Sequence, residues 1–331
     1  MHSTSGVGES LNGEGWLHWV IAWARPFRMP DFFLIAGLFL SRSILQTWTR
    51  YIDRKLVHFI YFYVVWMIIQ LVIKQGHLVL SEPAVFMKEL GLAFLEPYTT
   101  LWFIYILPIM FIIAKLTLAV PKWIVLLVAV LAEISCRMFD WHTGWIILDE
   151  FPVRFVYFYA GYIFAPLLFR WVSWVQRNRI LAIQCLLLWG LVNAAAVFTS
   201  VTVLPAEFVP VHMIIAQPLE FGSIAFYPVL SLFFGAAGIL AVLACAGLLA
   251  QKNCFKILKF AGSHSLVVYL SFFIPMAAVR IALIKMGISN VTAVSLFVTL
   301  AAIAVPLISY RVISHGKLKF LYERPSMFRV A

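Results

Sequence analysis

The sequence predicts an all-α fold, a polytopic bundle of transmembrane helices with nine spans in this chain. Hydrophobic residues make up 63% of the 331 residues and charged residues only 12%. That charged fraction is about half of what soluble domains carry. The mean hydropathy is +0.97. The apolar residues come in continuous stretches, and lipid offers no hydrogen-bond partner to an open strand edge, so each stretch is expected to be a helix.

Nine apolar stretches follow one another along the chain, each near the ~20 residues that suit one bilayer crossing. Their predicted ranges are 30–46, 56–73, 100–120, 122–136, 152–169, 180–204, 224–250, 264–285 and 290–313. Proline and tryptophan mark several ends, as in AVPKW at 119–123. The sequence therefore predicts one membrane-embedded bundle rather than two soluble domains.

The distribution of basic residues predicts the orientation of these helices. If residues 1–29 lie outside, 17 of the 25 Lys and Arg residues fall on the inner side and seven on the outer side. Cytoplasmic loops carry an excess of Lys and Arg, which also explains the net charge of +11 without nucleic acid as a partner. Residues 1–29 are therefore expected to be extracytoplasmic, and 314–331 to form a cytoplasmic tail.

This topology leaves the N-terminus outside with no signal peptide to carry it there. The simplest explanation is a missing first helix, cut off where an internal Met was taken as the start. Translocation of the N-terminus, or one span counted wrongly, are the alternatives. The four cysteines show no paired spacing, so neither a disulfide framework nor a metal site is predicted.

Several ionisable residues fall at membrane depth, where a charge at a helix centre costs about 2.5–3.5 kcal/mol. Asp31, Glu133, Arg154 and Arg280 lie in the outer third of their predicted helices, and His2 is on the same side. Each could simply anchor a helix end at the lipid headgroups. Opposite charges at one depth could instead pair and form a polar pocket within the bundle, which is the interpretation we favour for the set.

The stretch LDEFPVRFVYFYAGYIFAP (148–166) strengthens the interpretation as a pocket. Glu150 and Arg154 are four residues apart and can pair on one face of a helix. Tyr157 belongs to a group of tyrosines that bring hydroxyl groups into an apolar helix. An aromatic belt at the membrane interface would explain some of these tyrosines equally well.

Four segments carry a resemblance to a known family. They are FRMPDFFLIAGLFL (27–40), TLWFIYILP (100–108), YFYAGYIFAP (157–166) and AGSHSLVVYL (261–270). In this order they resemble the acyltransferase 3 family of integral membrane acyltransferases, and within it a bacterial inner-membrane branch. Two departures concern the choice of acceptor: the usual Ser-Gly is Ala36-Gly37 here, and a histidine often found in the late helix is Ser271.

The resemblance implies one membrane-embedded acyltransferase-like domain over residues 1–331, in a multi-pass protein of the inner (plasma) membrane. Such proteins are ten-helix bundles that move an acyl group, often acetyl, from cytoplasmic acyl-CoA to a hydroxyl of an extracytoplasmic carbohydrate or glycoconjugate. His2 stands where the family has a histidine regarded as catalytic. The arginine three turns earlier would precede Met1, in keeping with the missing helix, and a form without that helix is expected to be inactive.

The resemblance also suggests roles for the other polar residues. His2 is the expected base, which Asp31 or Glu133 would orient. Arg28, Arg154 or Arg280 would stabilise the oxyanion or bind acceptor groups, and Trp102 and Tyr105 would stack on a sugar. The candidate acceptor site is thus Arg28, Trp102, Tyr105, Glu150, Arg154, Tyr157 and Arg280. Acyl-CoA is the donor; the expected partners are the bilayer and a carbohydrate, with no metal or nucleic acid.

Two other functions would also explain buried charges. A carrier or flippase for a glycolipid or a small polar solute buries ionisable groups and uses broken helices. The sequence shows no repeated halves and no matched pair of interrupted spans, which disfavours a carrier. A non-catalytic membrane scaffold is the third possibility, and it would tolerate isosteric substitution of the buried charges.

Overall fold

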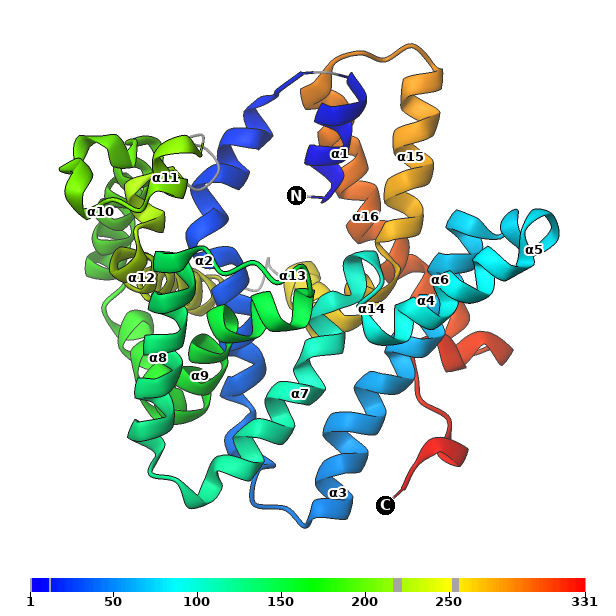
Figure 1. The fold of residues 1–331 in the computed structure, drawn as a ribbon, viewed down its shortest axis with the longest axis horizontal. Helices are drawn as coiled ribbons and strands as arrows, with labels where there is room; N and C mark the ends of the chain where they lie inside the picture. The colour runs from blue at the N-terminus through cyan, green and yellow to red at the C-terminus, as the bar shows by residue number, and fades with distance from the viewer. Residues whose placement is uncertain (1, 12, 217–221, 252–255, 331) are drawn as a thin grey trace. The chain divides into compact units, whose positions relative to one another are not determined.

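The computed structural model describes residues 2–11, 13–216, 222–251 and 256–330, and over these ranges the chain is helical with no β-strand (Figure 1). The only extended pairing within them is an isolated bridge between Ser200 and Ser223. The predicted all-α class is therefore confirmed.

Six helical segments in the described part of the chain are long and apolar enough to cross a membrane: Trp48–Gln75, Pro83–Ala119, Ile146–Arg177, Arg179–Phe198, Pro228–Ala250 and Val291–Ile313. A seventh is obtained if α14 (Ser265–Ser271) and α15 (Phe273–Lys285), which meet at a bend of 54°, form one span. The count of nine crossings is therefore not confirmed. The remaining two predicted spans correspond to α2 (Trp16–Leu38) and α8 (Lys122–Phe139), each of which carries three charged residues.

Helix α2 lies further toward the N-terminus than the predicted span 30–46. It begins at Trp16, continues through Pro26 and Pro30, and ends at Leu38. A short 3₁₀ helix, Leu40–Arg42, follows it. The predicted bounds were wrong because Arg28 and Asp31, on either side of residue 30, resemble the polar boundary of a span. They lie instead within a helix whose first turns are also rich in apolar residues.

The chain forms two compact units. The first comprises Met1–His18, Gln46–Phe111 and Ile257–Ala331, and the second comprises Trp19–Leu45 and Ile112–Lys256. The first contains α1 (His2–Leu11), α3 (Trp48–Ile52), α4 (His58–Gln75), α5 (Leu78–Ser81), α6 (Pro83–Leu95), most of α7 (Trp102–Leu116), α13 (Lys256–Ser263), α14, α15 and α16 (Val291–Ile313). The second contains most of α2, together with α8, α9 (Ile146–Arg177), α10 (Arg179–Phe198), α11 (Val211–Ile215) and α12 (Pro228–Ala250).

In the first unit, α1 packs against α15 and α16. The Ser3 and Thr299 hydroxyl groups are hydrogen-bonded at 2.9 Å. Gly6 lies so close to Arg280 that a Cβ atom at this glycine would fall 2.1 Å from the guanidinium. Helix α1 was not among the predicted elements, because its Ser- and Gly-rich sequence gives no apolar periodicity.

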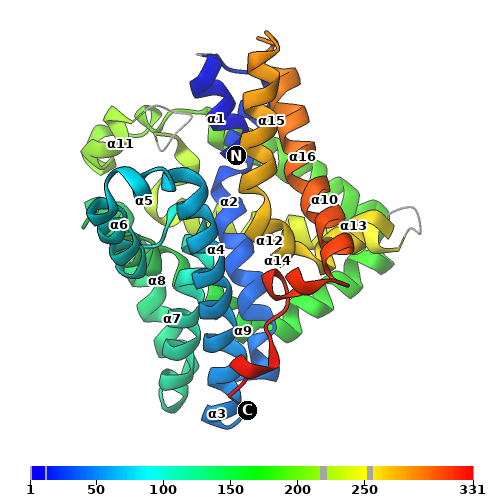
Figure 2. The same cartoon turned by 90° about the vertical axis from the view of Figure 1, so that its right-hand side faces the viewer.

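The C-terminal tail of the first unit is folded against α4 rather than extended (Figure 2). Asp53 is buried and accepts from Arg324 Nη2 at 2.7 Å and from the Val330 amide at 2.8 Å. The Trp66 indole donates to the Leu321 carbonyl at 2.9 Å. The sequence assigns both Asp53 and the tail to the cytoplasmic side, and the structure brings these two segments together.

In the second unit, α2 and α9 approach to backbone contact at two glycines. A Cβ atom at Gly37 would lie 1.8 Å from the Phe158 carbonyl oxygen, and one at Gly161 would lie 2.2 Å from the Leu34 carbonyl oxygen. Small residues at helix crossings allow this approach in membranes, where association relies on close packing. The crossing holds the charged middle of α2 in the same unit as the polar start of α9.

Candidate active site

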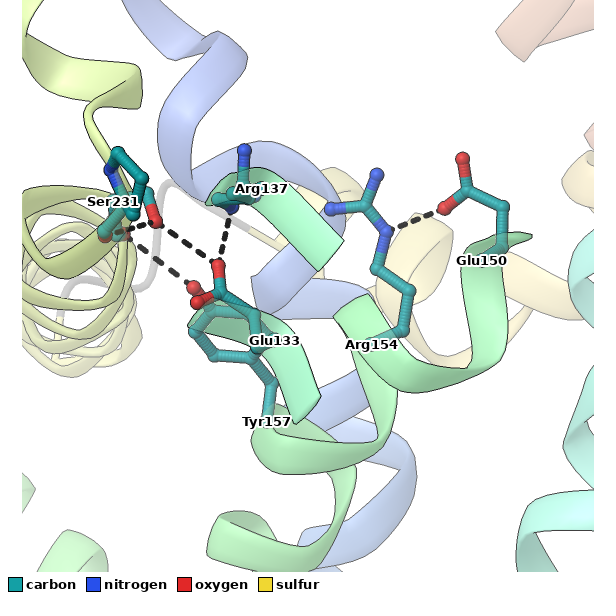
Figure 3. Close-up of polar contacts among 7 residues, drawn as sticks. Glu133, Arg137, Glu150, Arg154, Tyr157 and Ser231 are labelled. Carbon is teal, nitrogen blue, oxygen red and sulfur yellow. Dashed lines mark hydrogen bonds and ion pairs between the residues drawn. The ribbon is translucent and has the colours of Figure 1, made fainter. Parts of the chain in front are cut away.

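Glu133 is the most deeply buried charged group of the second unit, with 0% of its surface exposed. It projects from α8 toward α12 (Figure 3). Its Oε1 atom accepts a 3.0 Å hydrogen bond from the Ser231 hydroxyl and forms an ion pair with Arg137, one helical turn later. Its Oε2 atom is buried and has no hydrogen-bond partner. The carboxylate is thus positioned by one oxygen, while the other remains available to accept a proton or a hydrogen bond.

Helix α12 presents a face of small residues to this carboxylate. Ser231, Gly235 and Gly238 recur at helical spacing and are all buried. A Cβ atom at Gly235 would lie 2.6 Å from the Tyr157 hydroxyl oxygen, and one at Gly238 would lie 2.2 Å from Cβ of Phe27. The glycines therefore provide the room that the side chains of α9 and α2 occupy.

Tyr157 is buried on α9 and joins the same cluster. Its hydroxyl donates to the Ser231 carbonyl oxygen at 3.4 Å (Figure 3). On the same helix, Arg154 Nε donates to Glu150 Oε2 at 2.6 Å, as the four-residue spacing predicts, and both side chains are half-buried. Three residues predicted for the acceptor site thus lie on one helix, within two turns.

The structure does not bring about the expected pairing of acids and arginines from different helices. The pairs of this cluster, Glu133 with Arg137 and Glu150 with Arg154, each form within one helix. Asp31 forms no salt bridge with any described residue, and its Oδ1 atom is buried without a partner. The spacing of four residues favours pairing within a helix over pairing between helices.

Two predicted residues, His2 and Arg280, lie in the first unit. The backbone of His2 opens α1, one turn before Gly6, while its side chain lies outside the described part of the structure. The Arg280 guanidinium lies against Gly6. Arg280 is therefore close to the helix that begins with His2.

The two aromatic candidates for sugar stacking, Trp102 and Tyr105, also belong to the first unit, near the start of α7. Both are half-buried. The Tyr105 hydroxyl donates to the Phe94 carbonyl at 2.8 Å, and its ring meets the edge of Tyr63 at 4.8 Å between centroids. The Tyr105 hydroxyl therefore ties α7 to α6.

Sequence inspection missed Ser231 and Arg137 as partners of Glu133. Arg137 was assigned to an outer loop, although it follows Glu133 by four residues on a helix. The small-residue spacing of Ser231, Gly235 and Gly238 was a usable signal for a close helix contact. Asn193, fully buried on α10, was also missed; its amide donates to the Trp23 carbonyl at 2.8 Å.

An apolar groove of about 390 Å³ lies on the second unit beside α8 and α9. Its lining comprises Ile113, Thr117, Val120, Ile124, Val125, Val128, Ala129, Ala132, Phe151, Pro152 and Phe155. No charged side chain lines the groove, so it offers a sugar hydroxyl neither a base nor an oriented carboxylate. Across the described residues, no group of three His, Cys, Asp or Glu side chains is placed to hold a metal ion.

Comparison with known proteins identifies the family. A family model described as an acyltransferase domain matches residues 1–311, a range that includes every residue of the candidate site. No curated protein and no solved structure matches the chain. The match covers far more than half of the sequence, and it agrees with the four motifs. The chain therefore belongs to the acyltransferase 3 family and is a membrane protein with an acyltransferase domain.

Proposed function

We infer that the protein transfers an acyl group, acetyl being our first expectation, from cytoplasmic acyl-CoA to a hydroxyl of an extracytoplasmic carbohydrate or glycoconjugate. Membership of the acyltransferase 3 family supports the reaction type. The observation that carries the inference to particular residues is the buried carboxylate of Glu133, held by one oxygen and unpartnered at the other. A group that only anchors a helix end would not be buried in this way.

The reaction requires a base, a stabiliser for the tetrahedral oxyanion and two aligned substrates. In this proposal His2 takes the proton of the acceptor hydroxyl, whose oxygen then attacks the thioester carbon. The new C–O bond forms, the C–S bond breaks, and the leaving CoA sulfur receives the proton from the imidazolium. For the carboxylate that would orient this imidazole, the sequence offers Glu133 or Asp31.

The acceptor side of the proposal uses groups that suit a carbohydrate. Glu150, Arg154 and Tyr157 offer acceptors and donors for sugar hydroxyls from successive turns of α9. Trp102 and Tyr105 supply aromatic faces on which a sugar ring can stack. Arg280 contributes a donor beside the start of α1.

The test is acyl transfer by purified protein reconstituted in liposomes, expressed both from Met1 and with the codons upstream of Met1 included. Acetyl-CoA and a carbohydrate acceptor are added, and the release of the CoA thiol is followed together with ester formation on the acceptor. Glu133→Gln keeps the size of the side chain but removes the charge, so we expect it to lower kcat/KM by about 100-fold or more. The matched control is Glu207→Gln, at an exposed acid of the same unit.

The alternatives give different results in this assay. A carrier would move its solute without consuming the thioester. A scaffold would release no thiol, and Glu133→Gln would leave it unaffected. If thiol release is equal in the Glu133→Gln and Glu207→Gln proteins, Glu133 has no role in the reaction.

A further inference from the structure

Arg28 lies in the middle of α2 and forms no ion pair with any residue that the structure describes. The side chain is half-buried, yet its Nε and Nη1 atoms are fully shielded and form no hydrogen bond. It makes no salt bridge with any residue in the described ranges, although Asp31 lies only one turn away. Arginine keeps its charge under all ordinary conditions and has five N–H donors to satisfy.

The charged groups near Arg28 do not pair with it in the described structure. The charges of Arg25 and Arg154 act on it from within the same unit. Glu150 pairs with Arg154 and Glu133 with Arg137, and Asp31, one turn from Arg28, forms no salt bridge with it in the described structure. The guanidinium of Arg28 is thus not part of an ion pair among the described residues.

Such an arrangement is costly unless an anion completes it. An unpaired charge inside an apolar bundle loses its hydration without gaining a partner, and charged groups at membrane depth are therefore commonly functional. The planar guanidinium matches the oxygens of a carboxylate or phosphate in two parallel hydrogen bonds. Two parallel donors of this kind are Nε with Nη2 or Nη1 with Nη2, and in Arg28 neither Nε nor Nη1 has a hydrogen bond that would prevent either pair from forming.

We propose that Arg28 binds an oxyanion carried by the acceptor, so that the substrate is an anionic glycoconjugate. The assignment of this oxyanion to the acceptor, rather than to CoA, rests on the proposed function. The oxyanion is either a sugar carboxylate or a phosphate, and the latter can be free or part of a lipid headgroup.

The test measures binding directly, without turnover. The thermal unfolding midpoint of the purified full chain in detergent is recorded against increasing glucuronate, inorganic phosphate or dioleoyl phosphatidic acid at constant ionic strength. An anion that binds the folded state raises the midpoint in a saturable manner. We expect at least one of the three probes to do so, and the probe that does identifies the source of the oxyanion.

Three variants separate a specific site from general charge effects. Arg28→Gln should weaken the apparent affinity at least tenfold, whereas Arg28→Lys, which keeps the charge but not the planar fork, should weaken it less. Arg177→Gln, at an exposed arginine of α9, should behave as the wild type. Without the probe, Arg28→Gln should unfold at or above the wild-type midpoint because it removes an uncompensated charge.

Two results would overturn the proposal: no saturable effect of any probe on the wild type, or equal affinities in the wild type and Arg28→Gln. Failure of the proposed function looks different. A protein that binds an oxyanion through Arg28 but releases no CoA thiol would refute acyl transfer and leave this site in place. A protein that acylates a neutral carbohydrate but binds no oxyanion would refute the site at Arg28 and leave acyl transfer in place.

Discussion

Individual residues decide how the buried carboxylate of the second unit is held. Glu133 has only one neighbour from another helix that fixes its position by a hydrogen bond in the described structure, the Ser231 hydroxyl. The ion pair with Arg137 belongs to the same helix and orients the carboxylate only relative to α8. Ser231 therefore determines how Glu133 is placed relative to α12, although it carries no charge itself.

Replacing Ser231 by Ala should therefore lower activity while leaving the fold intact. A hydrogen bond to a charged group contributes about 1.5–3 kcal/mol, so a tenfold or larger loss of kcat/KM is expected in the thiol-release assay. Ser173→Ala is the matched control, because that exposed hydroxyl only donates to the carbonyl of its own helix. Equal activity in the two variants would mean that Ser231 does not position Glu133 for the reaction.

At the level of helices, the sequence predicted where apolar segments occur better than where they begin and end. Composition and continuous apolar runs sufficed for the helical class, but α2 extends to Trp16 because charged residues inside a helix resemble a helix end in sequence. The within-helix pair of Glu150 and Arg154 was predictable from spacing alone. The contact of Ser231 with Glu133 was not, since two helices approach in a register that their separate sequences do not specify.

A substitution at the crossing of α2 and α9 tests whether stability depends on the close approach of these two helices. Gly161→Ala would place a methyl group 2.2 Å from the Leu34 carbonyl oxygen, so the helices must separate. Overpacking costs about 1–3 kcal/mol, and we expect a lower unfolding midpoint and reduced activity. Gly91→Ala is the control, because no atom lies within 4 Å of the added Cβ in α6 and alanine favours a helix by about 0.5–1 kcal/mol. If both variants unfold at the same midpoint, the backbone contact does not limit stability.

For the whole molecule, the distribution of charge and the position of the tail agree that residues 42–55 and 314–331 lie on the same side of the membrane. The bias of basic residues predicts that 42–55 and 314–331 are both cytoplasmic. Independently, the first unit joins these segments through the buried pair of Asp53 and Arg324. Two segments that pair directly must lie on the same side of the bilayer. The contact therefore excludes every topology in which residues 42–55 and 314–331 lie on opposite sides.

We therefore predict a cytoplasmic C-terminus and an extracytoplasmic connection between α8 and α9. A fluorescent protein fused after Ala331 should fluoresce, whereas alkaline phosphatase at that position should be inactive, because it matures only outside the cytoplasm. Alkaline phosphatase inserted at Gly144, a residue with φ of +81° in the connection, should be active. The opposite result at both positions would mean that the bundle has the opposite orientation in the membrane. If alkaline phosphatase is active at both positions, or at neither, the chain crosses the membrane an even number of times between Gly144 and Ala331. The five crossings predicted for that part of the chain would then be wrong.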